Sequence, residues 1–213
     1  MKKIFILAAS LLMTGMLAQA QDLSLGAGYL YSTLTSQTGN TKESNEVTSG
    51  AYLGGSFNIP IVGELGLAPG LYYSILTGQG TGSYLDGLVQ GRVKFAEHAI
   101  NLPVYLNYGM ELGHADLFIF AGPTFQYGIS SKYKFEGSIP LVGFGAREEI
   151  DSYKDLSMGR FNIYMGGGLG VDLNELIRVT IGFDYGLLDL DKSDEDCKQY
   201  RYNFKVGVAY LFD

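Results

Sequence analysis

The chain has 213 residues, in which fifteen Lys and Arg stand against twenty-two Asp and Glu. This acidic balance argues against a nucleic-acid partner, and no basic stripe along the chain offsets it. One Cys excludes an internal disulfide, and one Cys with two distant His argues against a stable zinc site.

Residues 1–20 have the pattern of an export signal. Lys2 and Lys3 precede a short apolar run, and residues 18–20 are the small residues that a signal peptidase needs. The run is too short for a transmembrane helix, and no stop-transfer pattern follows it. We expect cleavage before Gln21, which leaves one domain over 21–213 with a net charge of −9.

Eight segments alternate apolar and polar residues with the period of two that marks a β-strand. They are 22–32, 49–59, 64–76, 100–111, 116–130, 160–172, 177–186 and 200–212. Each has at least ten residues, about the length that a tilted strand needs to cross a bilayer. The even number predicts an all-β fold, a transmembrane eight-stranded antiparallel up-and-down barrel.

The connections between these segments alternate in length. Three are short, near Pro60, Gly113 and Asn174, and four are longer, near 35–47, 77–98, 131–158 and 191–199. Short periplasmic turns and longer outer loops are typical of outer-membrane barrels.

The two parities of each strand differ in chemistry. In the segment 177–186, one parity holds Ile177, Val179, Ile181 and Phe183, and the other holds Arg178, Thr180 and Asp184. In the last five segments the polar parity is also rich in Gly, and the apolar parity is almost free of charge. An eight-stranded barrel has an interior only wide enough for side chains, which suits small and polar residues. We therefore predict that the apolar parity faces lipid and the polar parity faces the lumen.

Six charged residues of the polar parity are candidates for an ionic network in the lumen: Glu111, Arg160, Arg178, Asp184, Arg201 and Lys205. Folding the last two segments as a hairpin places Asp184 roughly opposite Lys205. A charge in the lumen needs a partner once it leaves water, so we interpret the pair as a buried salt bridge that fixes register. The alternative is that it gates a small pore.

Pro103 and Pro123 fit poorly within strands of a closed barrel, which has no edge. Proline donates no hydrogen bond to a ladder. We expect a bulge or a locally missing hydrogen bond at each.

Five stretches resemble the small outer-membrane β-barrel domain family of Gram-negative bacteria, often labelled the porin family: "INLPVYLNYG", "DLFIFAGPTFQYGIS", "NIYMGGGLGVDL", "RVTIGFDYGLLDL" and "YNFKVGVAYLF". The resemblance implies localisation in the outer membrane, contact with its lipid, and insertion by the barrel assembly machinery. The closing residues resemble the family's assembly signal, here Lys205, Gly207, Tyr210 and Phe212, although Asp213 follows. The family implies no single activity.

The leading hypothesis is a structural or surface-interaction protein, not an enzyme, whose lumen is plugged by polar and small side chains. A surface partner would bind the long outer loops, and we expect no cofactor or metal. A narrow channel for small solutes is the alternative. A lipid-modifying hydrolase based on His98, Glu97 and either Ser74 or Ser83 is a further alternative, although no nucleophile motif surrounds these serines. A soluble ligand-binding barrel is the most distant.

The segment 189–196 is strongly acidic. It resembles the start of a calcium loop but lacks the Gly and the final Glu that such a loop requires. We interpret it as a solvated loop, and Cys197 beside it as a free thiol.

Overall fold

The computed structural model describes residues 22–38, 41–84, 89–111, 115–139, 144–192 and 197–212. The expected signal peptide, 1–20, lies outside the described residues. The described residues form nine strands: β1 (Asp22–Thr38), β2 (Thr41–Val62), β3 (Leu65–Tyr84), β4 (Val89–Glu111), β5 (Ala115–Ile139), β6 (Phe144–Asp151), β7 (Phe161–Leu173), β8 (Ile177–Gly186) and β9 (Cys197–Phe212). No helix in this part of the chain is long and apolar enough to cross a membrane.

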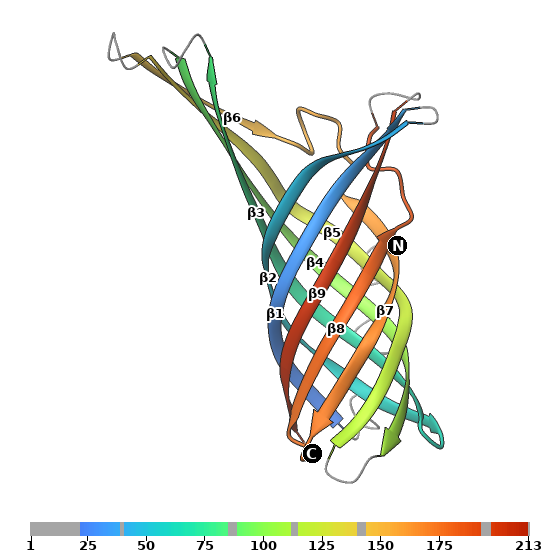
Figure 1. The fold of residues 1–213 in the computed structure, drawn as a ribbon. Coiled ribbons are helices and arrows are strands. Elements are labelled where there is room, and N and C mark those ends of the chain that lie inside the picture. Colours follow the sequence, from blue (N-terminus) through green and yellow to red (C-terminus); the bar gives the residue numbers. More distant parts are fainter. Residues whose placement is uncertain are drawn as a thin grey trace, which may run out of the picture.

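Eight of the nine strands close into an antiparallel ring (Figure 1). Strands β1 to β5 pair in sequence order, β5 pairs with β7, and β7, β8 and β9 follow. Strand β9 pairs with β1, which closes the ring. Strand β6 pairs with the outer part of β5 and lies outside the ring. This arrangement confirms the predicted eight-stranded up-and-down barrel.

Short turns lie at one end of the barrel, as the connection lengths predicted. Strands β2 and β3 are joined at Gly63 and Glu64, and β7 and β8 at residues 174–176. Gly63 has a φ of 53°, a left-handed conformation that glycine adopts without strain. Residues 112–114 of the third expected turn are outside the described residues. Leu23 pairs with Phe212, so both ends of the described chain lie at this end (Figure 1).

The outer connections differ from the prediction, because strands continue through most of three expected loops. Strands β1 and β2 remain paired to Thr38 and Thr41, and β3 and β4 to Tyr84 and Val89. The expected loop 131–158 contains the outer part of β5 and all of β6. The apolar parity ends where contact with lipid would end, but the backbone ladder continues with polar side chains. Figure 1 shows the outer parts of β3, β4, β5 and β6 leaning together away from the barrel axis.

A bulge at Ile129 exchanges the inward and outward faces of β5 at the point where this strand leaves the ring. The pairing with β4 passes from Gly128 to Ser130 and omits Ile129. A bulge of one residue exchanges the two faces of the strand beyond it. Lys134 beyond the bulge therefore points outward, whereas Tyr133 turns inward and packs on Phe95 of β4.

Pro103 and Pro123 interrupt the ladder between β4 and β5 without shifting it. Pairing stops after Pro103 and Thr124 and resumes at Leu106 and Ala121 in the same register. The interruption is thus a local loss of pairing, which was one of the two predicted outcomes.

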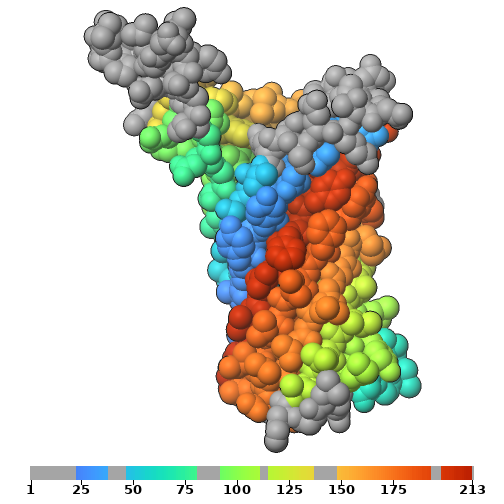
Figure 2. Space-filling model, in the orientation of Figure 1, coloured from blue at the N-terminus to red at the C-terminus, as the bar shows by residue number. Residues whose placement is uncertain are grey.

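Apolar side chains cover the outside of the ring, and the lumen holds the opposite parity. Seven outward residues in the middle of the wall are between 47% and 61% exposed: Leu25, Leu53, Leu106, Ile119, Leu169, Ile181 and Val208. Tyr108 and Tyr210 extend this surface toward the short turns, and Tyr29 and Tyr127 extend it toward the outer end. Such an apolar band between aromatic girdles is the surface that a bilayer covers. Figure 2 shows closely packed side chains over β1, β9, β8 and β7 on the face in view.

Aromatic side chains of the inward parity fill the lumen by lying over glycines. The ring of Phe118 lies over Gly170, and that of Phe120 lies over Gly168. A Cβ at Gly168 would stand 2.1 Å from a backbone oxygen of β8 and 2.6 Å from the Phe120 ring. The parity pattern predicts the glycines in the lumen, whereas the aromatic residues beside them there were not predicted.

We expect Gly168→Ala to lower the free energy of unfolding by about 1–3 kcal/mol, because the lumen is overpacked at this position. Gly109→Ala is the matched control, since the nearest described atom to its Cβ, apart from those of its chain neighbours, would be 3.8 Å away. Urea unfolding of the lipid-inserted barrel, followed by gel mobility, measures both variants. Equal losses in the two variants would contradict the packing argument.

Candidate functional site

The inward side chains form polar layers along the barrel axis, which together make the lumen the first candidate for a site. Arg178 and Asp172 form the layer nearest the short turns, where they face each other on β8 and β7. Their ion pair has an N–O distance of 2.6 Å, and the guanidinium lies 4.5 Å from the centroid of the Phe118 ring. This layer closes part of the lumen near its inner end.

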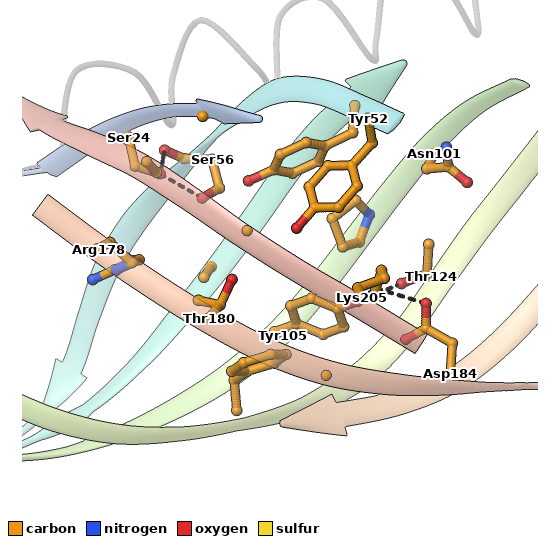
Figure 3. A pocket seen from close by; sticks show the side chains of 18 of the residues that line it. Ser24, Tyr52, Ser56, Asn101, Tyr105, Thr124, Arg178, Thr180, Asp184 and Lys205 are labelled. Atoms are coloured by element: carbon orange, nitrogen blue, oxygen red, sulfur yellow. Dashed lines mark hydrogen bonds and ion pairs between the residues drawn. The ribbon is translucent and has the colours of Figure 1, made fainter. Parts of the chain in front are cut away.

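Lys205 of β9 is the centre of the next layer (Figure 3). Its Nζ lies 2.6 Å from Asp184 Oδ2 on β8 and donates a hydrogen bond of 2.9 Å to the Tyr105 hydroxyl on β4. The Tyr105 hydroxyl in turn lies 2.8 Å from Thr124 Oγ1. Asp184 faces Asn203 directly in the register, so Lys205 reaches it diagonally. The structure therefore brings together the two residues that the hairpin argument paired.

An amide layer lies further toward the outer end. Asn101 donates to Ser74 Oγ at 2.8 Å, and Gln126 donates to Asn101 Oδ1 at 2.9 Å. The Tyr164 hydroxyl donates to Gln126 Oε1 at 2.9 Å. These bonds link β3, β4, β5 and β7 through the lumen, so half of the ring is cross-connected at this level.

Arg201 and Glu97 form the outermost ionic layer. Arg201 Nη1 lies 2.5 Å from Glu97 Oε1, and the two residues are only 5% and 2% exposed. Strands β9 and β4 are four steps apart around the ring of eight, so the ion pair joins opposite walls. The alternation of the sequence predicts Arg201 in the lumen but not its pairing with Glu97, because no local spacing connects residues 104 positions apart.

A small apolar layer adjoins this ion pair. Leu30, Leu76 and Phe95 are buried together, and the Tyr133 ring lies 4.8 Å from that of Phe95. Leu76 faces Glu97 in the register, whereas Phe95 lies two residues nearer the outer end. Phe95 therefore lies on the outer side of the ion pair, whereas Leu30 pairs with Lys205 in the register and lies on its inner side.

A cavity of about 130 Å³ remains in the inner half of the lumen. Tyr52, Tyr105, Asp184 and Lys205 are among its lining residues, as Figure 3 shows. Asp184 Oδ1 and Asn203 Oδ1 accept no hydrogen bond from the described residues. The cavity has these polar groups in its lining and is large enough for water, which would hydrate them.

Two other predicted network residues have different surroundings. Arg160 donates to the backbone oxygen of Ile129 at 3.1 Å and lies 4.7 Å from the Tyr153 ring centroid. It therefore supports the bulge at the outer end, and its part in a lumen network stays a prediction. Glu111 ends β4, and its side chain is outside the described residues.

The structure separates the residues considered for a hydrolase. His98 Nδ1 lies 2.6 Å from the Tyr73 hydroxyl on the outward parity. Glu97 and Ser74 are buried on the inward parity, so neither faces His98. The side chain of Ser83 and all of His114 lie outside the described residues. Among the described residues, no three His, Cys, Asp or Glu are grouped to hold a metal ion.

The residues that resemble the assembly signal occupy the closing strand. Tyr210 and Phe212 are exposed on the outside with ring centroids 4.6 Å apart, and Gly207 and Lys205 face the lumen. The role of these four residues as a signal stays a prediction.

The closed ring, the apolar outer wall and the polar lumen define a transmembrane β-barrel. A family model described as the outer membrane protein beta-barrel domain matches residues 18–192. The chain belongs to this family, and it is a protein of the Gram-negative outer membrane. No curated protein matches the chain.

Several solved barrels are similar to this chain. Ail, the attachment invasion locus protein of Yersinia pestis, is 14% identical, with a TM-score of 0.44 over 90% of this chain and 98% of Ail. Neisserial surface protein A is 11% identical, with a TM-score of 0.46 over 89% of this chain and 97% of that protein. OprG from Pseudomonas aeruginosa is 15% identical, with a TM-score of 0.44 over 91% and 97%.

We expect Glu97→Gln to lower the free energy of unfolding by about 3–5 kcal/mol, because Arg201 would remain buried without its counter-charge. The double variant Glu97→Leu with Arg201→Met is the control, since it removes both charges and keeps apolar volume. Urea unfolding in lipid vesicles should show a smaller loss for the double variant. A single variant as stable as the double one would contradict a direct ion pair.

Proposed function

We propose that this protein acts by surface interaction, as a barrel with a closed lumen that holds its outer hairpins above the membrane. The observation that carries this proposal is the pair of bridges between the opposite strands β4 and β9, Glu97 with Arg201 and Tyr105 with Lys205. Each bridge occupies the axis of a barrel whose interior is only as wide as its side chains. A binding role rather than catalysis is also supported by the separation of His98 from Ser74.

The outer hairpin of β5 and β6 is the proposed working surface. Lys132 and Lys134 both contact Glu149 across this hairpin, with N–O distances of 2.5 and 3.4 Å. The hydrogen bond from Lys132 holds the pKa of Glu149 below its ordinary value. A lowered carboxyl pKa stabilises the hairpin at and above the ordinary pKa, and that contribution is lost only as the pH falls through the lowered value. This contribution is therefore present at neutral pH.

We expect the folded wild-type barrel to give no steady channel steps in a planar bilayer. Heat-modifiable gel mobility confirms that the same sample is folded. Replacing the outermost bridge, in the double variant Glu97→Ala with Arg201→Ala, should raise ion leakage because it removes both side chains from the axis. Steady steps from the wild type would overturn the closed lumen.

A narrow channel is the alternative function, and the inner cavity favours it. A space of about 130 Å³, with two buried oxygens that accept no hydrogen bond from the described residues, could hold water or a small ion. If wild-type steps appear and shift with Asp184→Ala, the lumen is a path, and the layers at Lys205 and Arg201 are its constrictions.

The surface role requires the hairpin to face the outside of the cell. In a Cys197→Ser background, we expect Lys134→Cys on intact cells to react with a membrane-impermeant maleimide. Glu175→Cys, in a short turn at the opposite end, should react only after lysis. Glu175 is exposed, so a difference in labelling between the two variants would report access of the maleimide to that side of the membrane and not burial of the residue. Labelling of Glu175→Cys alone on intact cells would reverse the orientation.

A further inference from the structure

A second cavity, of about 360 Å³, lies at the outer mouth of the barrel. We call it the mouth recess, and its apolar lining consists of Leu34, Tyr133, Phe135, Leu156, Met158 and Leu190. These residues come from β1, from the outer part of β5, from the connection between β6 and β7, and from the segment after β8. A volume of this size matches the small-molecule sites that often lie in the mouths of β-barrels.

Backbone hydrogen bonds hold the walls of the mouth recess in place. Gly159 N–H donates to the Leu190 carbonyl at 2.8 Å, and Leu190 N–H donates to the Gln199 carbonyl at 2.9 Å. Met158 also forms a bridge with Asp191. These contacts join two connecting segments to β9, so the recess is preformed and would cost little ordering entropy on binding.

The inner side of the mouth recess is apolar. Tyr133 lines it, and the Tyr133 ring lies 4.8 Å from the ring of Phe95. The buried ion pair of Glu97 lies beneath Phe95, two residues further inward along β4. A ligand in the recess would therefore stay at the mouth, which makes it a binding site and not the entrance of a path.

Among the described residues that line the mouth recess, the one charged side chain is that of Asp191. Asp189 also precedes the buried Leu190. Neither Lys192 nor Lys198 is among the lining residues. The connection 151–160 carries two acidic and two basic residues and is neutral. Lys132 and Lys134 of β5 contact Glu149 on the opposite side of that strand. An anionic ligand would meet this field unfavourably, and a cation would be attracted.

We propose that the mouth recess binds the apolar part of a cationic amphiphile, with the positive group beside Asp191. The proposal rests on the surface role of the outer end proposed above and does not depend on a closed lumen. An alkyl or aromatic group would contact Leu156, Met158 and Phe135, and burial of that group would supply most of the affinity. Charge complementarity with Asp191 would supply the selectivity.

The absence of Trp from the chain allows a clean test. Leu156→Trp places a single fluorophore in the mouth recess, where Leu156 is 49% exposed. Lys134→Trp is the matched control on the outward face of β5. Both variants, in phosphatidylcholine nanodiscs, are titrated with three terminally brominated octyl probes: a trimethylammonium, an alcohol and a carboxylate. Bromine quenches a Trp that it contacts.

We expect saturable quenching of Leu156→Trp, with the cation binding about fivefold more tightly than the alcohol and the carboxylate more weakly than both. Adding the substitution Asp191→Asn should remove most of the difference in affinity among the three probes. The Lys134→Trp control reports partition into lipid and should show no saturable step. Equal quenching by the three probes, or the same quenching in the control, would overturn the proposal.

The outcome is distinguishable from failure of the proposed function. Channel steps from the wild type would overturn the closed lumen but leave selective quenching in the mouth recess intact. If Leu156→Trp does not fold, as judged by heat-modifiable mobility, Phe135→Trp reports from the same recess, where Phe135 is 38% exposed.

Discussion

The structure depends on side-chain contacts across the lumen between β4 and β9, two strands that are not neighbours in the ring. Arg201 and Lys205 lie four residues apart on the inward parity of β9, about 13 Å along the strand. Each reaches a residue of β4 on the opposite wall, Glu97 or Tyr105. A charge enclosed by an eight-stranded ring can be neutralised only from within the lumen, because no lipid headgroup reaches it. The same contacts therefore satisfy the charges and occupy the axis.

The bulge at Ile129 divides the molecule into a part suited to the membrane and a part suited to water. Before the bulge, β5 presents Phe125 and Tyr127 outward and Thr124 and Gln126 inward. Beyond it, lysines face outward and aromatic rings face inward. One unpaired residue thus exchanges the polarity of the two faces near the level where contact with lipid would end. A strand can continue into water in this way without exposing its apolar parity on the outer wall.

The sequence predicted the structure well where each face of a strand contacts a single environment, either lipid or the lumen. Alternation along ten or more residues predicted the eight strands of the ring, the lipid-facing parity of Ile181 and Phe183, and the diagonal contact of Asp184 with Lys205. It was less informative about the lumen, because Glu97 and Arg201 meet through closure of the ring and not through local spacing. The outer parts of β3, β4 and β5 were interpreted as loops because their apolar alternation stops, although backbone pairing needs no apolar face. The bulge was missed for a related reason, since a single extra residue resembles the end of a strand.

The placement of apolar residues at the mouth is the feature that neither the membrane nor the lumen requires. Phe135 and Leu156 lie beyond the ring, where no lipid would cover them, and they also lie outside the buried cluster of Leu30, Leu76 and Phe95. Exposed apolar residues scattered singly need no explanation, but apolar residues gathered around one preformed recess mark an interaction site. The acidic residues beside that recess further restrict what it accepts. The contacts across the lumen and the apolar mouth are thus two results of one arrangement, in which β4 and β9 meet through side chains on the barrel axis and the outer part of β5 turns its apolar face toward the recess.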